Sequence, residues 1–143
     1  MTNPRVRLSV RRQVRERAAF RCEYCLSPEL YIPDRLVIEH IMPRALEGDD
    51  ALENLALSCQ RCNALKSVFI EAYDPLTQKL APLYHPRWDR WAKHFCWSED
   101  FLTLVGLTPI GRATIERLQL NRGGVVNLRS LLLLTGKHPP ISE

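Results

Sequence analysis

Two Cys-x-x-Cys pairs constrain this chain more than any other feature of its sequence. The four cysteines are Cys22 and Cys25 in the first pair and Cys59 and Cys62 in the second. Thiolates at this spacing can close one tetrahedral zinc site. Closing that site pins together the two ends of the intervening segment, which carries Glu39 and His40, while Asn63 follows the last cysteine. The sequence therefore predicts that these polar side chains gather in a small space.

The charge of the chain is concentrated near its N-terminus. The 143 residues carry a net charge of +4, whereas residues 1–21 alone hold seven arginines against one glutamate, a net +6. A basic arm on a nearly neutral body favours a polyanionic partner, with nucleic acid first; a solvated helix face is the alternative. The length suits one domain, so we expect residues 1–143 to form a single unit.

The cellular compartment follows from what the sequence lacks. No apolar run follows the N-terminal charges as a secretory signal requires, and the longest apolar run, residues 131–134, is too short to cross a bilayer. We expect a cytoplasmic protein with reduced thiols. The paired motifs then favour a metal over disulfides or a redox pair. Cys96 lies among aromatic residues and is expected to be a buried structural thiol.

Hydrophobic spacing and turn residues predict a mixed α+β chain. Helices are expected at residues 9–20, 61–72, 108–118 and 125–134, short strands at 36–40 and 55–58, and a hairpin at 95–97 and 102–105. Pro75 marks the limit of the second helix, Thr108 with Pro109 begins the third, and Gly136 stops the last. The aromatic residues around Trp88 are expected to fill the core.

The order and spacing of several motifs in residues 22–66 resemble the HNH endonuclease family. These motifs are Cys22-x-x-Cys25, Ile38-Glu39-His40-Ile41-x-Pro43, Gly48, Leu52-Glu53-Asn54-Leu55 and Cys59-x-x-Cys62-Asn63-x-x-Lys66. The resemblance implies a ββα-metal (His-Me finger) core over residues 22–72, stapled by a structural zinc on the four cysteines. A basic helical arm (1–21) would precede this core and a helical extension (73–143) would follow it. Trp91-x-x-His94-Phe95 and residues 110–122 are loosely similar to the extension of some bacterial, notably cyanobacterial, members.

The resemblance also implies a division of labour in the site. Glu39, in a place commonly taken by Asp or His, and Asn63, often His in the family, would bind one catalytic Mg²⁺ or Mn²⁺. Their oxygen atoms suit such a hard cation. His40 would be the general base, since its unperturbed pKa lies near working pH, and Asn54 would orient its ring by side chain or backbone carbonyl. Neighbouring strand residues point to opposite faces, so Glu39 and His40 share a site only if the strand ends or twists there, or if the phosphate lies between them.

These expectations define a metal-dependent endonuclease that hydrolyses phosphodiester bonds in DNA. By resemblance, its products carry 5′ phosphate and 3′ hydroxyl groups. Four basic side chains are expected to contact phosphates: Arg11, Arg12, Arg15 and Lys66. A zinc-knuckle module that binds nucleic acid without catalysis stays open as an alternative, as does an RNA nuclease, because phosphate contacts do not tell DNA from RNA. A homodimer would ease cutting of both strands.

Overall fold

The computed structural model describes residues 5–140; residues 1–4 of the predicted arm and 141–143 of the predicted extension lie outside the described part. In chain order the elements are α1 (Leu8–Arg17), β1 (Val37–His40), β2 (Leu55–Ser58), α2 (Gln60–Lys66), β3 (Glu71–Tyr73), β4 (Leu80–Pro82), α3 (Trp91–His94), β5 (Phe95–Trp97), β6 (Leu104–Gly106), α4 (Pro109–Leu118) and α5 (Gly123–Leu134). Short 3₁₀ helices lie at Glu29–Tyr31, Arg44–Leu46 and Leu52–Asn54. No helix in the described range is long and apolar enough to span a membrane.

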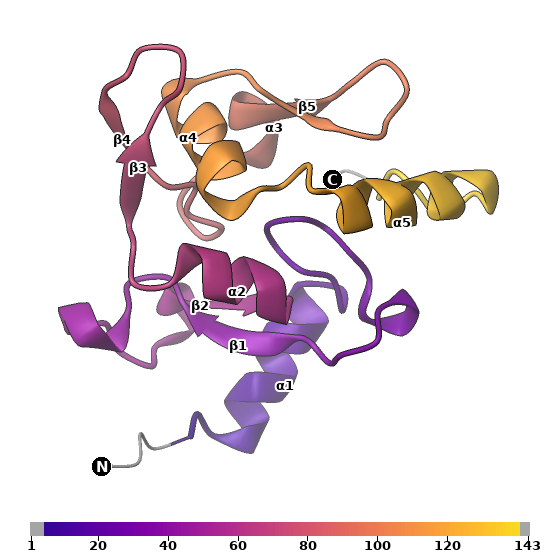
Figure 1. Cartoon of the computed structure of the whole chain (residues 1–143). Coiled ribbons are helices and arrows are strands. Elements are labelled where there is room, and N and C mark those ends of the chain that lie inside the picture. The colour runs from indigo at the N-terminus through magenta and orange to yellow at the C-terminus, as the bar shows by residue number, and fades with distance from the viewer. Residues whose placement is uncertain (1–4, 141–143) are drawn as a thin grey trace.

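The β1–β2 pair is the centre of the N-terminal half. The strands are antiparallel, with Glu39 opposite Ala56 and His40 opposite Leu55. Every residue of β2 is buried, as expected for a strand covered on both faces. Helix α1 lies against one side of the pair and α2 against the other (Figure 1). The arrangement is the predicted ββα core, and the two strands lie where the sequence placed them.

The C-terminal half packs onto α2. Helix α4 contacts α2, the β3–β4 hairpin and strand β6, and it begins as predicted, with the Thr108 hydroxyl accepting from the Gly111 N–H at 3.1 Å. Arg117 of α4 donates from Nε to the carbonyl of Leu65 in α2 at 3.0 Å. Gly136 follows α5 with φ +73°, the left-handed geometry that the predicted stop requires.

Several expectations about the fold are wrong. Helix α1 ends at Arg17 rather than at residue 20, because Ala19 and Phe20 take positive φ, and Cys96 is only partly buried. Helix α2 ends at Lys66 rather than near residue 72, because Ser67 takes a left-handed φ of 50° and the β-branched residues Val68 and Ile70 lead into a hairpin. In the aromatic cluster around Trp88, Tyr84 and Phe95 are buried as expected, but Trp88 itself is 78% exposed. Its indole stacks instead on His85, with ring centroids 3.9 Å apart and planes at 2°.

Candidate active site and cysteine cluster

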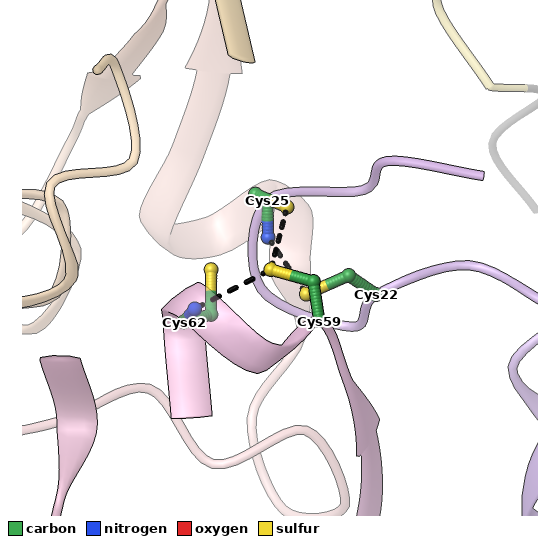
Figure 2. Close-up of side chains that lie close together, drawn as sticks. All are labelled: Cys22, Cys25, Cys59 and Cys62. Atoms are coloured by element: carbon green, nitrogen blue, oxygen red, sulfur yellow. Dashed lines mark hydrogen bonds between the residues drawn. The ribbon is translucent and has the colours of Figure 1, made fainter. Parts of the chain in front are cut away.

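The two Cys-x-x-Cys pairs form one compact cluster (Figure 2). The sulfur atoms of Cys22, Cys25, Cys59 and Cys62 all lie within 4.8 Å of one another, and all four residues are buried. The second pair opens α2, where the Cys59 sulfur caps the helix by accepting from the Cys62 N–H at 3.3 Å. The equivalent contact in the first pair joins the Cys25 N–H and the Cys22 sulfur at 3.4 Å. In each pair, a hydrogen bond from the backbone N–H of the second cysteine therefore orients the sulfur of the first.

The chemistry of the cluster fits a soft cation. Burial, followed by the hydrogen bonds from the neighbouring cysteines, raises the pKa of the Cys22 thiol well above its ordinary value. Four close sulfurs cannot all ionise in an apolar site unless a positive charge joins them. Part of that charge comes from Arg122, whose two terminal nitrogens lie 3.4 Å from Cys59 Sγ and 3.5 Å from Cys62 Sγ. The four sulfurs are the ligand set of a structural zinc site.

His40 ends β1 at the entrance of a tightly built loop. The Ile41 N–H donates to the Asn54 carbonyl at 2.9 Å, and the Asn54 side chain binds both backbone groups of Met42, at 2.8 and 3.1 Å. Asn54 also donates to the Asp49 carbonyl at 2.8 Å. A Cβ at Gly48 would lie 1.7 Å from the Met42 carbonyl oxygen, so no larger residue fits this turn. The loop that follows His40 is thus closed by Asn54 and Gly48.

The histidine ring is held by a residue that the sequence did not single out. Asp50 Oδ1 lies 2.7 Å from His40 Nε2 and 3.0 Å from a terminal nitrogen of Arg44. These hydrogen bonds, first from His40 and then from Arg44, lower the pKa of the Asp50 carboxyl. Asn54 does not contact the ring through any hydrogen bond that the structure gives it; it shapes the loop that delivers Asp50. Ten residues separate Asp50 from His40, and only a polar Asp-Asp turn could have hinted at it.

Glu39 and Lys66 lie elsewhere, on the buried side of β1. Glu39 is 3% exposed, and its oxygens lie 2.7 Å from Lys66 Nζ and 2.6 Å from the Tyr24 hydroxyl. Lys66 is 1% exposed and also donates to the Ile41 carbonyl at 2.9 Å. Burial raises the pKa of the Glu39 carboxyl, while Lys66 and Tyr24 act in the opposite direction. The alternation of the strand thus separates Glu39 from His40.

This placement bears on two predicted roles. Lys66 cannot meet a phosphate, because its ammonium is enclosed in an ion pair. Each oxygen of the buried Glu39 carboxylate is engaged, one by Lys66 and the other by Tyr24, so binding of one cation by Glu39 and Asn63 together would require the Glu39–Lys66 ion pair to open. Asn63 is exposed on α2. Within residues 5–140, the cysteine cluster alone brings three or more His, Cys, Asp or Glu ligand atoms close enough to hold an ion.

A basic groove runs beside His40. It encloses about 660 Å³ between α1 and β1, and we call it the arginine groove. It is lined by His40, by apolar residues including Leu8 and Phe20, and by six arginines: Arg5, Arg11, Arg12, Arg15, Arg35 and Arg44. None of its described lining residues is acidic. Arg11, Arg12 and Arg15, which were expected to contact phosphates, all line the arginine groove. Arg15 also donates hydrogen bonds to Glu29 and to the Leu36 carbonyl, at 2.9 and 3.1 Å.

Fold and site together define the class of protein. An antiparallel strand pair is followed by a helix, a histidine ends the first strand, and four cysteines join the two ends of the unit. Residues 22–69 match the family model described as HNH endonuclease. Residues 22–69 are therefore similar to an HNH endonuclease domain, and the strand pair, the helix and the four-cysteine cluster are consistent with the ββα-metal fold. No curated protein and no solved structure matches the chain.

Proposed function

We propose that this protein is a metal-dependent endonuclease that hydrolyses phosphodiester bonds in DNA, with His40 as the general base. The observation that carries the proposal is the position of His40 in the wall of the arginine groove. A nucleic-acid backbone in this groove would have its charge matched by arginines and its phosphates next to an imidazole. A neutral imidazole can take the proton of an attacking water.

Arginines of the groove divide into two sets by what they contact. Arg12 is exposed, and no hydrogen bond or ion pair within the described residues engages its guanidinium. Arg15 is committed to Glu29 and the Leu36 carbonyl, which fixes α1 to the segment before β1. We therefore assign phosphate binding mainly to the exposed set, with Arg12 as its central member, and a positioning role to Arg15.

The enzyme would use two metal ions, one structural and one catalytic. Zinc in the cysteine cluster holds the two knuckles together and so fixes both ends of the ββα unit. A Mg²⁺ or Mn²⁺ ion, when bound, neutralises charge on the phosphate and on the leaving oxygen. The exposed carbonyl oxygen of Asn63 is the ligand that we assign to it on this chain. Glu39 would join only if Lys66 released it.

The test is nicking of supercoiled plasmid by the zinc-loaded chain. We expect cleavage with Mg²⁺ or Mn²⁺, none with chelator, and a loss of about 10²- to 10⁴-fold in His40→Ala. Zinc content and melting temperature of each sample show whether chelator or mutation has damaged the fold instead. A salt-sensitive gel shift without nicking would replace the proposal with a zinc-knuckle binding module, and cleavage of RNA in preference to duplex and single-stranded DNA would replace DNA as substrate.

A further inference from the structure

The contact between His40 and Asp50 is built by the fold and is not a chance meeting of surface side chains. Asp50 sits at the end of a loop whose course is fixed by the close approach of Gly48 to Met42 and by three hydrogen bonds of the Asn54 side chain. The His40 side chain is 15% exposed and that of Asp50 47%, so the ring is enclosed while the carboxylate reaches it from the solvent side. Arg44 fixes the same carboxylate oxygen at 3.0 Å.

Chemistry decides how the protons are arranged in this contact. An ionised carboxylate only accepts hydrogen bonds, and with two donors on Oδ1 the pKa of Asp50 lies below its ordinary value. The proton of a neutral His40 ring must therefore reside on Nε2. Nδ1 is then the nitrogen with the free lone pair. Without the carboxylate, both neutral tautomers would be populated, and only one leaves Nδ1 able to take a proton.

We propose that Asp50 is a positioning residue that holds His40 as the Nε2–H tautomer, with Arg44 holding Asp50, so that Nδ1 serves as the base. The inference rests on the proposed function of His40. In the reaction, Nδ1 takes a proton from the attacking water, and the hydroxide so formed bonds to phosphorus as the leaving oxygen departs. The imidazolium that results is stabilised by the Asp50 carboxylate, which keeps its own charge.

The experiment reads the tautomer directly and separately from activity. Protein labelled with ¹⁵N-histidine and loaded with zinc gives ring nitrogen shifts for its four histidines, and loss of one set in His40→Gln assigns residue 40. At a pH where the ring is neutral, we expect Nε2 to show the shift of a protonated nitrogen and Nδ1 that of a bare one. In Asp50→Ala both shifts should move toward the average of the two tautomers. A matched control is Asp49→Ala, which removes the same charge one residue away; the Asp49 carboxylate accepts from the Ala51 N–H and does not touch the ring.

Kinetics complete the test. We expect Asp50→Ala to lower kcat on plasmid about 10²-fold, within the range of base catalysis, with KM nearly unchanged, while Asp49→Ala keeps both. Unchanged His40 shifts in Asp50→Ala would overturn the proposal, as would equal kinetic losses in the two variants. Rescue of Asp50→Ala by higher Mg²⁺ would also overturn it, because the carboxylate would then be a cation ligand. If His40→Ala itself cleaves normally, the proposed function fails, while the shifts still decide whether Asp50 sets the tautomer.

Discussion

Glu39 and His40 are adjacent on β1, yet they meet opposite environments. The pleat turns His40 toward the arginine groove and Glu39 toward Lys66 and Tyr24, beneath α2. Removing two charges from water is costly, and a buried ion pair offsets that cost only with good geometry and further hydrogen bonds. Here the Tyr24 hydroxyl and the Ile41 carbonyl provide those bonds. We infer that the Glu39–Lys66 pair fixes α2 against β1.

This view predicts a strong coupling between Glu39 and Lys66. Glu39→Gln leaves a buried ammonium without a counter-charge and should lower the free energy of unfolding by about 3 kcal/mol. Glu39→Gln combined with Lys66→Met should lose less than the sum of the single changes, with a coupling of about 1–3 kcal/mol. Urea unfolding of the zinc-loaded proteins measures both values.

Glu71→Gln is the control for the loss of one carboxylate, because Glu71 is exposed on β3. It should leave the free energy of unfolding within about 0.5 kcal/mol of the wild type. If Glu39→Gln instead unfolds like the wild type and loses only metal-dependent cleavage, Glu39 is a cation ligand and not the structural partner of Lys66.

The sequence predicted which residues carry the chemistry of this site better than it predicted which residues those side chains contact. His40 and the four cysteines are recognisable because the nature and spacing of these residues are what their chemistry needs. The burial of Glu39, by contrast, depends on Lys66 returning from α2, far along the chain. Asp50 reaches His40 only through a loop closed by Gly48 and Asn54. Such contacts depend on tertiary geometry, which neither periodicity nor local propensity contains.

Arg122, just before α5, joins the C-terminal half to the cysteine cluster. Its guanidinium spans the sulfurs of Cys59 and Cys62, at 3.4 and 3.5 Å, and so would offset the negative charge that four thiolates leave around one divalent ion. The buried Arg129 of α5 donates to the Cys25 carbonyl at 3.2 Å. Both knuckles are therefore held by arginines from the extension, and zinc retention should depend on this half of the chain.

Arg122→Gln is expected to weaken zinc retention. Groups that hydrogen-bond to metal ligands typically contribute about 10- to 100-fold in metal affinity, so zinc transfer to a chelating dye should be faster by about 10-fold. The rate of zinc transfer from Arg122→Lys should lie between those of the wild type and Arg122→Gln, since one ammonium cannot span two sulfurs as a guanidinium does. Arg117→Gln is the matched control, because Arg117 ties α4 to the Leu65 carbonyl without touching sulfur. Equal acceleration by Arg117→Gln would mean that loosened packing, and not charge, releases the metal.

The β3–β4 hairpin is tied to α4 by an ion pair that should depend on pH. Arg112 meets the Asp74 carboxylate with two nitrogens, at 2.9 and 3.0 Å. Arg112 first, and then hydrogen bonds from Leu76 and Thr77, hold the pKa of Asp74 well below its ordinary value. A carboxyl whose pKa is lowered by folding stabilises the fold above its unfolded pKa, near about 3.9, and loses that contribution as the pH falls through the lower folded value.

Asp74→Asn should therefore melt at a lower temperature than the wild type at pH 7. The gap between the two should stay constant down to about pH 5 and narrow as the pH falls further. Calorimetry of both proteins in excess zinc from about pH 7 to about pH 3 measures this gap through the range in which it begins to narrow. Protonation of the cysteines affects both proteins alike and cancels in the difference. Melting curves that fall in parallel over the whole range would show that the Asp74 carboxylate gains nothing from Arg112.

Local signals predicted the β5–β6 hairpin and helices α4 and α5, but they did not predict the β3–β4 hairpin, helix α3 or the way the surface of the extension is used. Thr108 with Pro109 starts α4, and Gly136 stops α5, because caps and left-handed residues act within a few positions. The predicted end of α2 was too far along the chain, because Ser67 ends the helix with a left-handed φ that a serine does not usually adopt. Trp88 was placed inside on its size alone, whereas a turn after His85 carries it outward to stack on that ring.

The positive charge of the molecule is concentrated on one face, so the local charge there is higher than the net charge of +4 indicates. The arginine groove brings α1 together with Arg35 and Arg44, which flank β1 in sequence. Positive charge therefore lines the groove beside His40, none of whose described lining residues is acidic, while Asp50 binds the ring itself. A polyanion approaching this face would meet several arginines at once and release condensed counterions from each phosphate that it places there.

The dependence of DNA affinity on salt tests this distribution of charge. The logarithm of the binding constant should fall linearly with the logarithm of salt concentration, and Arg12→Gln should reduce the slope by about 0.9, the value for one lost phosphate contact. Lys79→Gln removes the same charge from the exposed β3–β4 turn, outside the groove, and should leave the slope unchanged. The His40→Ala background, in which cleavage is slowed by about 10²- to 10⁴-fold on this hypothesis, permits both measurements in Mg²⁺ by fluorescence anisotropy. Equal slopes for the Arg12 and Lys79 variants would mean that DNA affinity depends on the total charge of the protein. The arginine groove would then not be the surface that places a phosphate next to His40.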